Sequence, residues 1–243
     1  MTPGVNAFGQ CLGPPLPGWQ PPQFPGPVSL AGRFCRLERL DPDRHAAELH
    51  SANAPDDGRL WTYLPYGPFA DLASYRAWME RHWLGQDPLL FAIVDAVSGR
   101  ALGMAGYLRI DPANGSIEVG HLAYAPSLQR SPAATEAMYL LMAHAFGLGY
   151  RRYEWKCNAL NEPSRAAALR LGFTFEGLFR QAAVVKGHNR DTAWYSLLDS
   201  EWPVAKAAFE AWLAPENFGP DGRQRRRLAG LRAALANGQC PPA

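Results

Sequence analysis

Two side chains that can transfer a proton lie near the middle of the chain. Glu118 and His121 stand three positions apart in residues 117–125, a β-branched and aromatic segment without helical spacing that predicts a buried strand. A carboxylate or an imidazole can take a proton from a nucleophile directly or through a water molecule. On a regular strand the two side chains point to opposite faces, unless a bulge intervenes, so either residue is a candidate base. The alternatives are that Glu118 pairs with an arginine and that His121 is a core histidine.

A turn that suits a phosphate group follows this strand. From Pro132 onward, apolar residues recur at intervals of three and four, which predicts a helix. The passage from strand to helix directs unpaired backbone N–H groups and the positive end of the helix dipole at one spot. Pro132 fits the first helical turn, where its missing N–H has no cost. Residues 129–134 are therefore predicted to form an anion-binding turn.

Two sequence blocks resemble the GNAT superfamily of acyl-CoA-dependent N-acyltransferases. Residues 129–134 (Gln-Arg-Ser-Pro-Ala-Ala) resemble its Q/R-x-x-G-x-G/A pyrophosphate loop, and residues 134–137 resemble the helix start of its Rim-type branch of ribosomal-protein acetyltransferases. Residues 158–173 resemble the family's N-x-x-S…G-F helix at matching spacing. Pro132 departs from the pattern, because it replaces the first glycine and removes an N–H that could face a phosphate. The resemblance covers residues 32–200.

The resemblance implies acetyl-CoA as the cofactor. Its pyrophosphate would lie on the predicted turn, and its pantetheine arm would lie in a wedge beside the central strand. The asparagines of the second block would be cofactor contacts rather than catalysts. The implied cofactor-binding residues are Leu122, Ala123, Tyr124, Gln129, Arg130, Ser131, Ala133, Ala134, Asn158, Asn161 and Ser164.

Acyl transfer from a thioester to an amine needs a base for the amine and a proton for the leaving thiolate. Many members of the family have a tyrosine seven residues after the second asparagine of the block, but this chain has Ala168 there. Ser164 is then the nearest hydroxyl and the candidate acid, with helix capping or CoA binding as its alternative role. Cys157 as an acyl-carrying nucleophile lacks an evident histidine partner. Together with Glu118 and His121, Ser164 completes the set of predicted catalytic residues.

An aromatic loop precedes the central strands. Residues 60–69, interrupted by prolines and a glycine, also resemble part of the Rim-type branch. Four aromatic side chains in one connecting loop either pack over the core as a lid or line a pocket for the acyl acceptor. The resemblance favours the second interpretation and implies Trp61, Tyr63 and Tyr66 as substrate-binding residues.

The remaining patterns predict an α+β protein. Strands are expected at 32–39, 89–95, 101–110, 117–125, 152–157, 173–186 and 191–198. Helices are expected after the N-cap residues Asp41 and Asp71, from Pro132, over 161–171 and in the tail. This order resembles the GNAT order, which implies a mixed, mostly antiparallel central sheet flanked by helices, with a C-terminal helical extension.

The N-terminal segment differs from the predicted domain, residues 28–200. Residues 1–27 hold eight prolines and five glycines, which predicts an irregular arm. If the arm packs on the domain or on a neighbour, Phe8, Trp19 and Phe24 are its candidate anchors.

The C-terminal extension, residues 201–243, is helical in pattern and rich in arginine. Its basic stretch contains Arg223, Arg225, Arg226, Arg227 and Arg232 between leucines. It is either an exposed amphipathic helix or a contact surface for RNA, a ribosome or a second molecule.

Composition excludes several protein classes. Apolar residues make up 47% and charged residues 19%, which is typical of a globular domain, and the net charge of +2 is too small to indicate nucleic acid as the main ligand. No apolar run reaches the ~18 residues that span a bilayer, and no secretory signal is evident. The four cysteines form no C-x-x-C pair, which argues against a zinc ribbon or a disulfide framework. We expect a cytoplasmic protein without a metal or a membrane contact.

The sequence therefore predicts an acetyl-CoA-dependent N-acetyltransferase that acts by direct attack of an amine. The acceptor is a protein N-terminus or a small-molecule amine, and a homodimer is left open. The alternative is a catalytically silent GNAT-fold module that binds CoA, protein or RNA.

Overall fold

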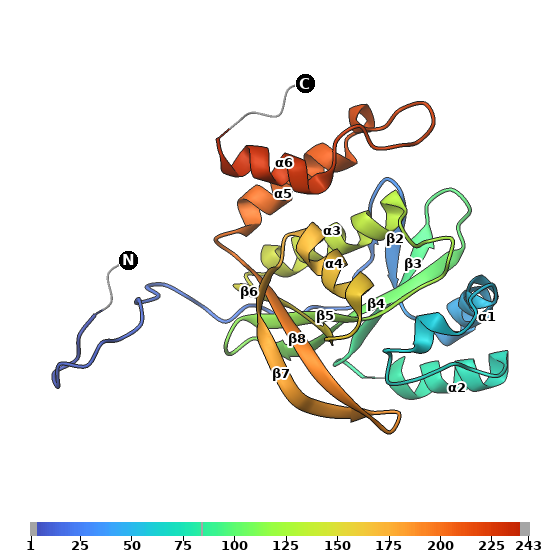
Figure 1. The fold of residues 1–243 in the computed structure, drawn as a ribbon, viewed down its shortest axis with the longest axis horizontal. Coiled ribbons are helices and arrows are strands. Elements are labelled where there is room, and N and C mark those ends of the chain that lie inside the picture. The colour runs from blue at the N-terminus through green and yellow to red at the C-terminus, as the bar shows by residue number, and fades with distance from the viewer. Residues whose placement is uncertain (1–3, 84, 239–243) are drawn as a thin grey trace.

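A computed structural model describes residues 4–83 and 85–238 of the chain, and its centre is one eight-stranded sheet (Figure 1). The strand order is β1-β2-β3-β4-β5-β6-β8-β7. The strands are β1 (Leu30–Ala31), β2 (Cys35–Arg39), β3 (Leu89–Asp95), β4 (Ala101–Asp111), β5 (Ser116–Tyr124), β6 (Arg152–Asn158), β7 (Thr174–Val185) and β8 (His188–Leu198). Only β5 and β6 run parallel, and the other neighbours are antiparallel. The predicted mixed, mostly antiparallel sheet is confirmed.

Helices cover both faces of the sheet (Figure 1). The helices are α1 (Pro42–Asn53), α2 (Leu72–Trp83), α3 (Pro132–Gly147), α4 (Glu162–Leu171), α5 (Trp202–Leu213) and α6 (Leu228–Ala236), with short 3-10 turns η1 (Arg59–Trp61) and η2 (Pro215–Asn217). Side chains of α1 and α2 share a core with alternate residues of β3 and β4, among them Met104. Side chains of α3, α5 and α6 join the core on the other face, where Val119 and Tyr195 lie. The central strands are therefore buried from both sides.

The carboxylate of Glu136 fixes helix α3 against strand β2. It is buried, and it accepts hydrogen bonds from the backbone N–H groups of Arg33, Phe34 and Cys35 at 2.8, 2.6 and 2.8 Å. Gly32 is required beside it, because a Cβ at that position would lie 2.3 Å from the Glu136 Cδ. This contact also explains why the strand expected at 32–39 begins only at Cys35: the turn between β1 and β2 donates its N–H groups to a side chain.

The helix starts follow the predicted caps. The Asp41 side chain accepts from the Asp43 N–H at 2.8 Å, and Asp71 Oδ1 accepts from the Ser74 N–H at the same distance. Each bond satisfies one of the N–H groups that a first helical turn leaves unpaired.

In the basic stretch of the C-terminal extension, the residues up to Arg227 are not helical. This corrects the prediction that the stretch is part of a helix. Helix α6 begins only at Leu228. Before it, the buried Asn217 carbonyl accepts from the Arg225 N–H at 2.6 Å, and its side chain accepts from the Arg226 N–H at 2.9 Å. These contacts hold the stretch in an extended turn, because they take the N–H groups that a helix would use.

The N-terminal arm extends away from the sheet at its beginning (Figure 1). Phe8 is 87% exposed, so it does not anchor the arm within this chain, and Phe24 is also exposed. Trp19 is half-buried beside Gly115, in the loop between β4 and β5. Within the described ranges, no helix has the length and apolar character needed to cross a membrane.

Candidate active site

The sheet opens between β5 and β6. Their parallel pairing ends at Val119 and Trp155, whereas β5 continues to Tyr124 and β6 continues to pair with β8 as far as Asn158. Among the residues that the structure describes, no strand therefore pairs with residues 120–124 on their β6 side, and their backbone groups can pair with an extended ligand, as an added strand would. The predicted pantetheine contacts Leu122, Ala123 and Tyr124 lie on this open edge.

A β-bulge in β5 brings the two candidate bases to one face. Gly106 pairs with Gly120, but Met104 pairs with Ala123, so His121 and Leu122 together oppose one residue of β4. His121 has a φ of 53°, which few residues other than glycine adopt. The extra residue cancels the alternation that separates positions 118 and 121 on a regular strand. His121 consequently points to the α1–α2 face, as Glu118 does.

A second irregularity directs an arginine to Glu118. Leu108 pairs with Glu118 and Asp111 pairs with Ser116, so β4 carries an extra residue between them, and Arg109 has a φ of 48°. The carboxylate of Asp87 accepts the N–H groups of Arg109 and Ile110, both at 3.0 Å. The Asp87 side chain thus compensates for the hydrogen bonds that the sheet loses there.

Glu118 is the centre of a buried ionic cluster. Arg109 Nη1 lies 2.8 Å from both carboxylate oxygens, and Lys156 Nζ lies 2.9 Å from Oε2. Lys156 also contacts Glu154 at 2.7 Å and lies 3.7 Å from the centre of the Trp194 ring. Burial raises the pKa of Glu118, and the two neighbouring cations oppose that shift. With only 4% of its surface exposed, Glu118 has its oxygens occupied by cations.

His121 is held by an aromatic neighbour. Its ring stacks on Tyr66 with centroids 5.6 Å apart and an interplanar angle of 12°, and Nδ1 lies 3.2 Å from the Tyr66 hydroxyl. Burial, with a smaller contribution from the nearby His82 and Arg109, lowers the pKa of His121 to about 4. The imidazole is therefore neutral at pH 7, while burial raises the pKa of Tyr66 and keeps its phenol protonated.

The predicted anion-binding turn has the expected shape. Ser131 is the N-cap of α3; its Oγ accepts from the Ala134 N–H at 3.1 Å and donates to the Leu128 carbonyl at 2.6 Å. Gln129 Nε2 donates to the Tyr124 carbonyl at 2.9 Å, and Arg130 has a φ of 58°. The side chains of Gln129 and Ser131 therefore shape the turn, and a ligand would meet mainly its backbone.

Helix dipole and side-chain charge both act at the start of α3. Ser131 takes the Ala134 N–H and Pro132 has none, so Ala133 supplies the free N–H of this first turn among the described residues. Arg170, in the last turn of α4, places Nη2 3.0 Å from Thr135 Oγ1. This guanidinium adds positive charge beside the turn. The sequence analysis did not predict Arg170 as a site residue, and its position near the end of the second block was the only sequence feature that could have indicated it.

The second block caps helix α4. Asn161 Oδ1 accepts from the Ser164 N–H at 3.2 Å, and Asn158 Oδ1 accepts from the Leu160 N–H at 2.9 Å. The Ser164 hydroxyl accepts from the Trp155 indole at 3.1 Å, at the end of the β5–β6 pairing. Ser164 therefore lies beside the opening of the sheet.

Neither Ala168 nor Cys157, the two other positions considered for catalysis, supplies a group for the reaction. Ala168, which replaces the family tyrosine, is fully buried in the core. Cys157 is buried, and burial raises the pKa of its thiol, so it is not the reactive thiolate that nucleophilic catalysis needs.

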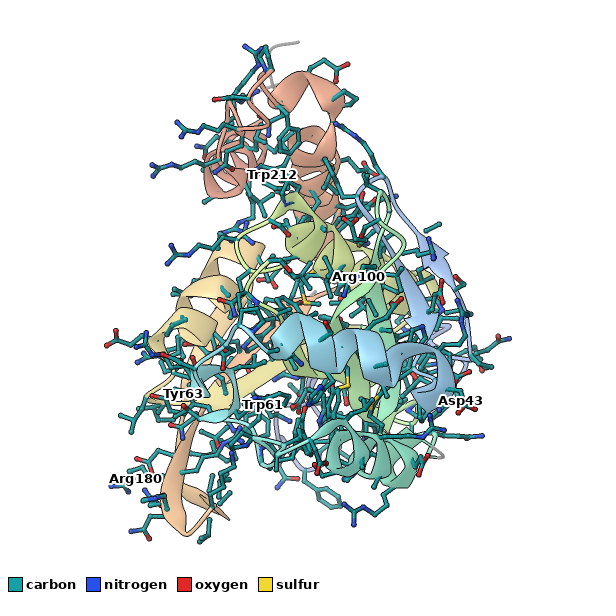
Figure 2. The ribbon with its side chains drawn as sticks, turned by 90° about the vertical axis from the view of Figure 1, so that its right-hand side faces the viewer. Asp43, Trp61, Tyr63, Arg100, Arg180 and Trp212 are labelled. Atoms are coloured by element: carbon teal, nitrogen blue, oxygen red, sulfur yellow. The ribbon has the colours of Figure 1, made fainter. Side chains whose placement is uncertain are left out.

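The aromatic loop borders a cavity of about 590 Å³. The cavity is lined by Gly58, Trp61, Thr62, Tyr63, Pro68, Asn158, Leu160, Val185, Lys186, His188 and Asn189. Lys186 Nζ donates to the Trp61 carbonyl at 2.7 Å, and the Tyr63 hydroxyl donates to the Leu160 carbonyl at 3.2 Å, which ties the loop to the β7–β8 hairpin and to the end of β6. Figure 2 shows Trp61 and Tyr63 on the side of the molecule where this hairpin, marked by Arg180, extends.

The three aromatic residues predicted to bind substrate therefore differ in position. Tyr63 lines the cavity, whereas Tyr66 packs between His121 and Trp78 and does not line it. Trp61 does both, because it is 7% exposed, packs on Tyr66 and still borders the cavity. The lid and the pocket interpretations of the loop thus apply to different side chains.

Known proteins are similar to this chain in architecture and in sequence. The model of the acetyltransferase (GNAT) domain matches residues 35–174. The structure of a GCN5-related N-acetyltransferase from Brucella melitensis is 48% identical, with a TM-score of 0.88 over 90% of this chain and 100% of that one. The "Putative ribosomal N-acetyltransferase YdaF" of Bacillus subtilis is 31% identical over 70% of this chain and 92% of its own length. The ribosomal-protein-serine acetyltransferase of Escherichia coli is 31% identical over 41% of this chain and 56% of its own length.

The family match covers the open edge of β5, the turn at the start of α3 and the cap of α4, which are the elements that the two sequence blocks predicted. The relatives named as ribosomal acetyltransferases support the Rim-type branch. This chain is a member of the GNAT acetyltransferase family, of the Rim type, and an N-acyltransferase.

Proposed function

We propose that this protein transfers an acetyl group from acetyl-CoA to a primary amine, by direct attack of the amine within a ternary complex. The observation that carries the proposal is the open edge of β5 at residues 120–124, which leads directly into the capped turn at the start of α3. An extended molecule with a pyrophosphate at one end could therefore place its chain along the open edge and its pyrophosphate at the turn.

The residues present fit acetyl-CoA. The Ala133 N–H and the α3 dipole would hold the pyrophosphate, with Arg170 adding charge, and the backbone of Leu122 to Tyr124 would pair with the pantetheine amides. When bound, the cofactor supplies an activated thioester carbonyl. The small side chains of Ala133 and Ala134 allow a phosphate to approach the backbone.

We assign the proton acceptor to His121 rather than to Glu118. The Glu118 oxygens are engaged by Arg109 and Lys156, and taking a proton there would weaken both ion pairs. His121 is neutral at pH 7 and lies at the bulge beside the open edge. With Nδ1–H donating to the Tyr66 oxygen, Nε2 keeps a lone pair for the amine proton.

In the proposed reaction the amine nitrogen attacks the thioester carbonyl and its proton passes to His121, directly or through water. The carbon–sulfur bond then breaks, and the thiolate takes a proton. Ser164 is the proposed donor, because its hydroxyl lies where the β5–β6 pairing ends and accepts a hydrogen bond there from the Trp155 indole. Solvent would return the proton to the serine.

The cavity beside Trp61 and Tyr63 is the proposed acceptor site. Both relatives above with ribosomal names suggest a protein N-terminus as the acceptor, and a small-molecule amine would use the same chemistry. A panel of amines and N-terminal peptides, assayed for thiol release from acetyl-CoA, tests the proposal. Release with at least one amine, with the product acetylated on nitrogen, is expected. Tight acetyl-CoA binding without turnover on any amine would instead indicate a silent CoA-binding module.

A further inference from the structure

A row of charged side chains crosses the α1–α2 face of the sheet, the face to which Glu118 and His121 point. It consists of Arg109 on β4, Glu118 on β5, Lys156 on β6 and Arg190 on β8. Arg190 belongs to this face because its Nε donates to Thr192 Oγ1 at 3.2 Å, and because residues at intervals of two on a strand share a face. Further along the same strand, Trp194 receives Lys156 on its ring.

Positive charge exceeds negative charge along this row. Glu118 is shared by Arg109 and Lys156. The next carboxylate, Glu154, is shared by Lys156 and Arg152, and Arg152 also pairs with Glu176. Among the described residues, no carboxylate lies within ion-pair distance of the half-buried Arg190, and Glu118, which acts on it from farther away, is already bound by Arg109 and Lys156. A buried charge is unfavourable unless it is paired, and Glu118 is shared among three cations, so a further anion beside Arg190 would be favourable.

The neighbouring cavity has the same bias. Its lining contains Lys186 and His188 and no Asp or Glu among the described residues. Lys186 Nζ contacts the Trp61 carbonyl, not a carboxylate, so its positive charge is not neutralised within the lining. Apart from Gly58, the other lining residues carry aromatic, aliphatic, hydroxyl or amide side chains. The cavity lining therefore favours a ligand that carries an anionic group.

We propose that the acceptor carries an anionic group, a carboxylate close to its amine, which binds against Arg190 and the free side of Arg109 with Lys186 at the rim. The inference rests on the proposed acetyl transfer and specifies its substrate class. Two sources supply this chemistry: the α-carboxylate of a free amino acid, and an acidic side chain next to the amino end of a peptide. In both, the anion orients the amine toward the open edge of β5.

Matched amines test the proposal with the wild-type protein. The peptide pair Ala-Glu-amide and Ala-Gln-amide differs in one charge at nearly equal amine basicity. The pair alanine and alaninamide, compared per deprotonated amine, tests the amino-acid source. We expect kcat/KM to favour the anionic member of at least one pair by about tenfold or more. Equal values in both pairs overturn the inference and leave the proposed function standing. No thiol release with any amine overturns both.

Variants connect the preference to the named residues. Arg190→Gln is expected to reduce the preference for the anionic member about tenfold, through KM, while Arg190→Lys keeps most of it. Arg223→Gln is the control, because Arg223 lies on the C-terminal extension and its side chain is 88% exposed. If Arg190→Gln does not fold, Lys186→Gln gives the same test at an exposed position. A preference that survives in the folded variants of both residues overturns the assignment.

Discussion

The imidazole of His121 lies nearly parallel to the ring of Tyr66, 5.6 Å away, with Nδ1 3.2 Å from the phenol oxygen. Tyr66 in turn packs on Trp78 of helix α2, with ring centroids 4.1 Å apart. The aromatic loop therefore positions the His121 ring on the central strand. The sequence predicted Tyr66 and His121 separately, Tyr66 as a substrate contact and His121 as a base.

Tyr66→Phe is expected to lower kcat about tenfold or more while leaving KM for acetyl-CoA unchanged, because the stack remains but the partner that fixes the imidazole tautomer is lost. Steady-state kinetics with both substrates measures this. Tyr63→Phe is the matched control, since Tyr63 lines the cavity and does not contact His121. Equal loss of kcat in the two variants would argue against a role of Tyr66 in holding the base.

His121→Ala is expected to lower kcat by a factor of ~100 to 10,000 without weakening acetyl-CoA binding. Glu118→Gln removes the charge that holds Arg109 and Lys156, so its expected effect is a lower free energy of unfolding with a smaller loss of kcat per folded molecule. Chemical denaturation and kinetics on both variants separate the effects. A stable Glu118→Gln protein without turnover, beside an active His121→Ala protein, would return the role of base to the glutamate.

The titration of His121 provides a prediction about pH. Its pKa is about 4 in the folded chain against 6.5 for an ordinary histidine, because burial disfavours the charged ring. Between these two values the unfolded chain binds a proton that the folded chain does not, so this residue lowers the free energy of unfolding as the pH falls from 6.5 to 4 and has no effect above 6.5. NMR titration of the His121 imidazole measures the midpoint. A His121 midpoint near 6.5 would contradict the buried, neutral ring.

Ala133→Asp is expected to weaken acetyl-CoA binding at least ~100-fold, because the carboxylate would meet the pyrophosphate at the only small residue of the first turn that keeps a free N–H among those described. Calorimetry on the folded variant measures the affinity. Ala236→Asp, at the end of α6, is a control for the added charge. Unchanged affinity in Ala133→Asp would place the phosphates elsewhere.

Glu136→Gln is expected to lower the free energy of unfolding by about 2–3 kcal/mol, since an amide cannot accept from all three N–H groups that the carboxylate holds and at least one would be buried without a partner. Urea denaturation measures the change. Glu216→Gln, at an exposed position, should stay within about 0.5 kcal/mol of the wild-type value. A similar value for both would show that the β1–β2 turn does not depend on the charge.

Local sequence patterns predicted most of the elements, because caps and periodicity act over a few residues. Asp41 and Asp71 cap the helices that were expected to follow them, and Pro132 begins the helix after the predicted anion-binding turn. The two blocks at 129–134 and 158–173 also indicated the family, since a cofactor-binding turn and its capped helix keep their residues at fixed spacing. The arginine stretch before Leu228 was misjudged, because the buried Asn217, not local propensity, determines its backbone.

The geometry of the site was decided only by the tertiary structure. A bulge adds one residue to β5 and so reverses the face of every side chain beyond it, and no pattern in residues 117–125 reveals it. The sequence therefore left Glu118 and His121 as alternative bases, on opposite faces of a regular strand, whereas the folded sheet places them on one face in different environments. The partners that distinguish them, Arg109, Lys156 and Tyr66, come from other strands and from a distant loop. Burial and neighbouring charge, which determine the protonation of the two groups, depend on these contacts between segments that are remote in sequence.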